Sequence, residues 1–124
     1  MFQVEQVAHS IDIGRIGQRI ARKYLEKSGY TTIQENVRIF HDEIDILAMK
    51  SGQLCIIEVK TRSSQKYETA EYHFSKSKIS NLKRAAFALS NVHSVTENIS
   101  LQGIAIQLNY ANKIANIKHF LSLV

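Results

Sequence analysis

Two apolar segments joined by a short turn constrain the fold of this chain more than any other feature. Residues 43–50, EIDILAMK, and residues 53–60, QLCIIEVK, carry apolar side chains on both faces, which is typical of central strands covered on both sides. Ser51-Gly52 between them is a turn signal. The sequence therefore predicts a hairpin inside a sheet that has helices on both faces.

The rest of the chain alternates between helical and extended patterns. The predicted elements are helices at residues 11–28 and 76–90 and strands at residues 31–39 and 99–108, with a loop at residues 61–74. The last segment, 113–124, fits either a helix, because apolar residues recur at three- and four-residue steps, or an edge strand. This order indicates one mixed α/β domain over residues 1–124, a length that suffices for a single core.

The charge of the chain favours a polyanionic partner. Lys and Arg number 16 against 11 acidic residues, which gives a net charge of +5. Arg15, Arg19 and Arg22 share one face of the first predicted helix, as either a solvated surface or a stripe that faces phosphates.

Several kinds of site and location find no support in the sequence. No apolar run is long enough to cross a membrane and no signal peptide is evident, so we expect a cytoplasmic protein. No Gly-rich phosphate loop or zinc spacing of the histidines is present, so no small-molecule cofactor is indicated. The single Cys55 lies in an apolar run and is expected in the core.

The predicted hairpin brings charged side chains together. If Ser51-Gly52 is the centre of the turn, Asp45 faces Glu58 and Glu43 faces Lys60, all on one face of the sheet. Directly opposed residues have Cβ atoms roughly 4.5–5.5 Å apart. Two carboxylates at that separation repel each other in a half-buried sheet, so something must offset the repulsion.

A divalent cation is one such offset. Mg²⁺ and Mn²⁺ bind two protein carboxylates and complete their shells with water and phosphate oxygens, and the Val59 carbonyl would add a ligand. Lys60 would then hold or deprotonate an attacking water, a set of parts suited to phosphodiester hydrolysis. The alternative is structural, because Glu43 and Lys60 can form a cross-strand ion pair and the other acids can bind loop amides or be protonated.

The same residues carry a family resemblance. The motifs GRIGQRIARKYLEKSGY, NVRI, EID and EVKTR, and the lysine at 78 in SKSKISNLKRAA, resemble the YraN-type family of small bacterial proteins over about residues 14–90. That family is similar to archaeal Holliday-junction resolvases, in the PD-(D/E)XK restriction-endonuclease-like superfamily. The resemblance implies a three-layer α/β fold of that type, with a central mixed sheet flanked by helices.

The resemblance also assigns roles. It implies that Asp45 and Glu58 bind Mg²⁺ or Mn²⁺ and that Lys60 is the catalytic lysine. Glu43, the acid of the family's GEID motif, is a further predicted residue of the metal site. Lys78 matches a basic position at the start of the second helix. Helical geometry places Lys78 near the azimuth of the apolar residues at 82, 85 and 89, so we expect it to lean toward the sheet.

Three departures bear on activity. The helix glutamate of the family's GxxGExxA motif is Gln18 here, which would offer a neutral oxygen to the metal. The glycine of GEID is Asp42, and the FD of a later strand is Gln102-Gly103. The leading hypothesis is a metal-dependent DNA endonuclease or DNA-processing protein, and the alternatives are a non-catalytic nucleic-acid-binding module or a partner-binding protein on the same fold.

DNA is the expected partner. Four basic residues are predicted to contact it: Lys78, Arg62, Lys76 and Arg15. Tyr67 and Tyr72 in the predicted loop are further candidates for base contacts, or simply solvated loop residues. A homodimer would suit paired cuts in a junction, although no dimer face is evident in the sequence.

Overall fold

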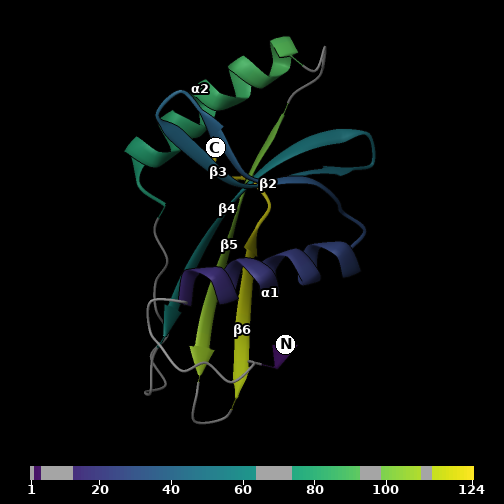
Figure 1. Cartoon of the computed structure of the whole chain (residues 1–124), viewed down its shortest axis with the longest axis vertical. Coiled ribbons are helices and arrows are strands. Elements are labelled where there is room, and N and C mark those ends of the chain that lie inside the picture. The colour runs from purple at the N-terminus through teal and green to yellow at the C-terminus, as the bar shows by residue number, and fades with distance from the viewer. Residues whose placement is uncertain (1, 4–12, 64–73, 93–98, 110–112) are drawn as a thin grey trace.

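The computed structural model describes residues 2–3, 13–63, 74–92, 99–109 and 113–124. Within them, six strands form one sheet in the order β1-β6-β5-β4-β3-β2 (Figure 1). The elements are β1 (Phe2–Gln3), α1 (Ile13–Lys27), β2 (Thr31–Ile39), β3 (Asp42–Lys50), β4 (Gln53–Ser63), α2 (Lys76–Val92), β5 (Ser100–Asn109) and β6 (Ile114–Phe120). Only β4 and β5 pair in parallel among these strands, so the sheet is mixed.

The central hairpin turns at Ser51-Gly52, as predicted, and the turn has two residues. Lys50 pairs with Gln53, and Ser51 and Gly52 both adopt positive φ angles, of 51° and 80°. Two successive positive φ angles are the mark of a type I′ turn, whose twist matches that of the flanking strands. The turn therefore fixes the register in which residue numbers sum to 103, as expected from the sequence.

Helices α1 and α2 cover opposite faces of the sheet. Apolar residues of α1, such as Ile20 and Leu25, pack in one cluster with Ala48 and Ile57, whereas Leu82 of α2 belongs to a second cluster. The second cluster takes its strand residues from alternate positions, including Leu47, Leu54 and Ile56. These two clusters confirm the three-layer α/β arrangement with a central mixed sheet.

The predicted elements agree with the structure in type and order, and where their ends differ, the difference is one to three residues. Residues 114–120 form the edge-side strand β6, which decides between the helix and strand alternatives, and Cys55 is buried as expected. The loop predicted from residue 61 was wrong at its start, because β4 continues to Ser63 and pairs with β5. The candidates Tyr67 and Tyr72 lie outside the described residues.

No helix in the described part of the chain is long and apolar enough to cross a membrane.

Helix α1 packs against β4 closely enough that one glycine is required. A methyl group at Gly17 would overlap the Thr61 side chain and lie 2.7 Å from its Cβ and Cγ2 atoms. At Gly14, one turn earlier, a methyl group would meet no atom within 4 Å. Position 17 thus fixes how near the helix comes to the sheet.

Replacing Gly17 by alanine is expected to lower the free energy of unfolding by about 2 kcal/mol, because the helix must move off β4. Gly14→Ala is the matched control and should leave stability unchanged or slightly raised. Urea unfolding monitored by circular dichroism measures both. Equal stabilities for the two variants would contradict the close contact between α1 and Thr61.

Candidate active site

The pairing of strands β3 and β4 ends next to Asp45. The ladder between them runs from Lys50↔Gln53 to Ile46↔Ile57 and ends there. On β3, Ile44 packs with the α2 cluster whereas Ile46 packs with the α1 cluster, so the regular alternation of faces is broken between them. Asp45 therefore occupies the gap that opens between the two strands.

Beyond the end of the β3–β4 ladder, a hydrogen bond from the β4 backbone to a β3 side chain joins the two strands. The Val59 backbone N–H donates to Asp45 Oδ2 at 2.8 Å, so the carboxylate satisfies an amide of β4 at the gap. Val59 follows Glu58 in the chain, and the Asp45 and Glu58 carboxyls lie close enough that the charge of Asp45 raises the pKa of Glu58. The two predicted acids are thus brought together, by the divergence of the strands rather than by continued pairing.

Two half-buried carboxyls that lie close together cannot both ionise easily. Burial raises the pKa of Glu58, and the neighbouring Asp45 charge raises it further, to about 8. Burial likewise raises the pKa of Asp45, against the opposing effect of the Val59 amide. Since both pKa values are raised, the two carboxyls hold their protons to a higher pH than isolated carboxyls do.

One oxygen of the pair has no donor. Glu58 Oε2 is buried and receives no hydrogen bond from the described residues. A buried carboxyl oxygen in this state either carries a proton or lacks a cation to neutralise it. The other oxygen, Oε1, lies 3.4 Å from Lys78 Nζ.

Lys78 leans toward the sheet, as the helical azimuth predicted. Together with Lys60 and Glu58 it lines a cavity of about 380 Å³, to which Phe74 and Ser75 also contribute. Lys60 lies two residues after Glu58 on β4 and lines the same cavity. The structure therefore assembles Glu58 and two lysines around one hollow.

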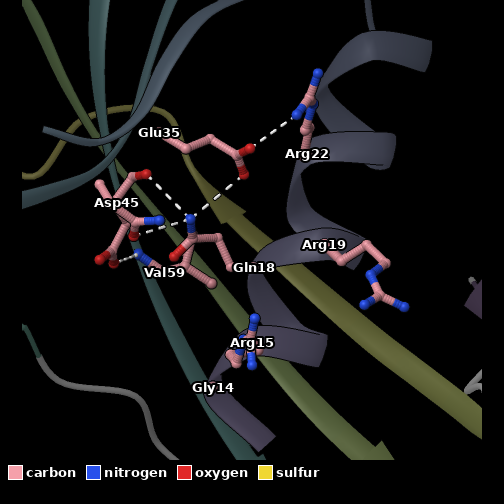
Figure 2. Close-up of a pocket in the computed structure, with 9 residues that line it drawn as sticks. Gly14, Arg15, Gln18, Arg19, Arg22, Glu35, Asp45 and Val59 are labelled. Carbon is pink, nitrogen blue, oxygen red and sulfur yellow. Dashed lines mark hydrogen bonds and ion pairs between the residues drawn. The ribbon is translucent and has the colours of Figure 1, made fainter. Parts of the chain in front are cut away.

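A second cavity, of about 520 Å³, lies on the α1 side of Asp45 (Figure 2). Gln18 reaches across it, and its Nε2 lies 3.3 Å from the Asp45 carbonyl oxygen, 3.3 Å from Glu35 Oε1 and 3.2 Å from Asn36 Oδ1. Three acceptors around one nitrogen fix the orientation of the amide. Gln18 thus holds the backbone of β3 in place beside the acidic pair. Its role as a metal ligand stays a prediction.

Arginines of α1 line the same cavity. Arg15, Arg19 and Arg22 are all exposed along it, so the predicted stripe borders the site (Figure 2). Arg22 is held by ion pairs of 2.8 Å to Glu26 and to Glu35. The acidic pair consequently lies between a cavity lined by arginines and one lined by lysines.

The prediction that Glu43 faces Lys60 across the hairpin is wrong. Because the β3–β4 ladder ends at Ile46, it does not extend to these two residues. Glu43 is exposed and pairs with Arg38 on β2, and its charge still acts on Asp45. Among the described residues, no group of three or more His, Cys, Asp or Glu side chains is arranged to hold a metal ion.

Two other basic residues predicted to contact DNA, Lys76 and Arg62, lie outside the two cavities of the site. Lys76 is the first residue of α2 and is exposed, and Arg62 is exposed near the end of β4. Neither lines the two cavities described above. Their contact with DNA stays a prediction.

Gly103 has a packing role that the sequence did not reveal. It pairs with Glu58 across the parallel strands, and a Cβ there would lie 2.6 Å from Phe74 Cζ. Phe74 also packs edge-on against Phe120, with ring centroids 5.6 Å apart. An aspartate at position 103, as in the family's FD motif, would therefore displace Phe74 from the wall of the lysine-lined cavity.

Sequence reasoning missed Glu35 and Asn36, which bind Gln18. No local pattern marks these residues, since β2 meets α1 only through the tertiary fold. Asn36 does adopt a positive φ of 52°, a conformation that asparagine tolerates better than most residues. Asparagine inside a strand pattern was therefore the one available signal of a local irregularity.

Comparison with known proteins gives a family match. Residues 17–106 match the uncharacterised protein family UPF0102. A UPF0102 protein of Clostridium acetobutylicum is 30% identical over 109 residues, which cover 85% of this chain and 87% of that protein. One from Alkaliphilus metalliredigens is 48% identical over 58 residues, or 47% of this chain and 51% of the relative.

The match to a third relative, from Chlorobaculum parvum, is 50% identical over 42% of this chain and 40% of the relative. For the Alkaliphilus and Chlorobaculum proteins the chain thus matches about half of the relative's length or less. Among solved structures, a repair endonuclease from Pyrococcus abyssi gives a TM-score of 0.44 at 17% identity, over 86% of this chain and 41% of that one.

Proposed function

The chain belongs to the uncharacterised protein family UPF0102, and we propose that this member hydrolyses phosphodiester bonds in DNA with the help of a divalent metal ion. The family match confirms the resemblance drawn from the EID and EVKTR motifs. The observation that carries the proposal is that the Asp45 and Glu58 carboxyls lie beside each other where the β3–β4 ladder ends, near enough that the Asp45 charge raises the pKa of Glu58.

The residues present fit a hard divalent cation. Asp45 and Glu58 offer carboxylate oxygens, the ligand type that Mg²⁺ and Mn²⁺ prefer, and Glu58 Oε2 is buried without a donor among the described residues. A site with only two protein carboxylates leaves room for waters and for substrate phosphate oxygens. When bound, such an ion would polarise the phosphate and lower the pKa of a water molecule.

The side chains around the pair supply the other requirements of hydrolysis. Lys60 and Lys78 line the cavity beside Glu58, where their positive charges would stabilise charge on a phosphate. The Val59 amide holds Asp45 in place, and Gln18 fixes the backbone behind it. In this proposal Asp45 and Glu58 hold the ion, Lys60 assists the water and Lys78 binds the phosphate.

A second candidate is a nucleic-acid-binding module that does not cut. Two features of this chain favour it. Gln18 is neutral where the family has a glutamate. The pKa of Glu58 is raised to about 8, which keeps that carboxyl protonated at neutral pH. A protonated ligand binds metal ions weakly, because the ion must first displace the proton. The basic net charge would serve either candidate.

A cleavage and binding assay separates the candidates. Purified protein is incubated with branched, single-stranded and duplex DNA in Mn²⁺, and binding is measured in parallel at several salt concentrations. The proposal expects Mn²⁺-dependent cutting of at least one DNA form, together with affinity that falls as salt rises. Salt-sensitive binding without cutting would support the binding module, and neither cutting nor binding would favour a partner-binding protein.

A further inference from the structure

A groove outside the acidic site is formed by two exposed phenylalanines. Phe40, in the turn between β2 and β3, and Phe87, on α2, are 71% and 73% exposed. They line a hollow of about 700 Å³ together with Ser80, Lys83, Arg84 and Ala88. Two large aromatic side chains left in solvent on one surface indicate a binding site, since single exposed apolar residues are common but grouped ones are not.

The geometry of the turn between β2 and β3 does not explain why residue 40 is a phenylalanine. Ile39 pairs with Asp42, so Phe40-His41 is a two-residue turn, and Phe40 adopts a φ of 56°. Bulky residues rarely adopt positive φ, and glycine or asparagine would serve such a turn better. Because Phe40 is also exposed, neither turn geometry nor core packing explains a phenylalanine at this position.

The two walls of the groove are fixed to each other. Arg84 Nη2 lies 3.3 Å from Asp42 Oδ2 and 2.7 Å from Asn81 Oδ1, so α2 is tied to the strand that follows the turn. The groove is therefore present before anything binds. A pre-formed site loses less entropy on binding than one that must be ordered.

Basic residues border the groove and continue along the helix. Lys76, Ser80, Lys83 and Phe87 recur at steps of four, three and four residues, so they share one face of α2 over about three turns. The same helix places Lys78 at Glu58 by its opposite face. This face of α2, from Lys76 to Phe87, thus runs from the aromatic groove to the end of the helix that adjoins the acidic pair.

We propose that the groove between Phe40 and Phe87 receives an unpaired base of the nucleic-acid substrate, while Lys83 binds the adjoining backbone. This inference rests on the proposed function and adds that the substrate contains single-stranded DNA. Bases stack on aromatic side chains and phosphates bind lysines, so apolar walls with a basic border fit both parts of a nucleotide. A second copy of this basic chain fits less well, because it would bring like charges to the border.

The test compares a short thymidine oligonucleotide with an abasic oligonucleotide of the same length, without metal, by fluorescence anisotropy. The wild type is expected to bind the thymidine strand more tightly. Phe87→Ala should weaken that binding about tenfold and leave binding of the abasic strand unchanged, since only the stacked base is lost. Lys83→Gln should weaken binding of both strands, because both carry the phosphates.

Leu121→Ala is the matched control, because Leu121 is another large apolar side chain, 67% exposed, that does not line the groove. Equal weakening of both strands by Phe87→Ala, or none, would overturn the base site and leave the proposed function standing. A change in the sedimentation of the protein alone on Phe87→Ala would also overturn it, in favour of self-association. If the wild type binds neither strand, the base site fails, and the cleavage assay on branched and duplex DNA decides the proposed function separately.

Discussion

Asp45→Asn is expected to reduce Mn²⁺-dependent DNA cleavage by roughly 100-fold or more, because it removes one of the two charged ligands that we propose for the ion. Binding of DNA should be retained or slightly strengthened, since a negative charge near the phosphates is lost. Cleavage rates and affinities measured side by side on the same DNA separate the two effects.

The substitution should leave the fold in place. Asp45 accepts a hydrogen bond from the Val59 amide at 2.8 Å, and an asparagine carbonyl oxygen can accept the same bond. Glu26→Gln provides the control, because Glu26 is an exposed acid on α1 that pairs with Arg22 and lines neither cavity. Cleavage by Asp45→Asn at the rate of the wild type would remove Asp45 from the mechanism.

The stability of the protein is expected to depend on pH through Glu58. The pKa of this carboxyl is about 8 in the folded chain and 4.5 in its ordinary state. Between these values the folded state holds more protons than the unfolded state, so the free energy of unfolding falls as pH rises. The stabilisation is complete below about pH 4.5 and is lost as pH passes about 8.

Glu58→Gln should remove this dependence. Relative to the variant, the wild type is expected to lose about 2 kcal/mol or more between about pH 5 and about pH 8. Urea unfolding at a series of pH values gives the difference directly. His119, whose pKa is lowered by burial and by Lys50, titrates in part of this range, but its contribution is common to both proteins and cancels.

Glu26→Gln is again the control and should keep the pH dependence of the wild type, because its carboxylate is exposed. Parallel curves for the wild type and Glu58→Gln would mean that Glu58 titrates as an ordinary carboxyl. In that case the contact with Asp45 would be absent in solution. This measurement requires no DNA and no metal, so it tests the geometry independently of activity.

The hairpin and its register were predictable because they depend on local rules. The Ser51-Gly52 turn sets which residues oppose each other, and periodicity of two assigns their faces. From these rules the proximity of Asp45 and Glu58 followed, and the helical period of α2 likewise gave the inward direction of Lys78. Each of these inferences uses residues close in sequence or joined by one short turn.

The end of the ladder was not predictable by the same means. Periodicity assigns faces but does not say where two strands diverge, and here the Val59 amide bonds to the Asp45 side chain instead of a backbone carbonyl. The bracing of Gln18 by Glu35 and Asn36 depends on how α1 sits over β2, which only tertiary packing decides. The strand at residues 114–120 was ambiguous for a similar reason, since its pairing with β5 overrides a helix-compatible pattern.

The most direct test of the central claim, that the two acids are close enough to share a cation, is a carbon-detected NMR titration of the Glu58 carboxyl with and without Mg²⁺. The account predicts a pKa of about 8 in the absence of Mg²⁺ and a clearly lower pKa in its presence, because a bound cation favours the ionised carboxylate. An ordinary pKa near 4.5 that Mg²⁺ does not change would contradict it.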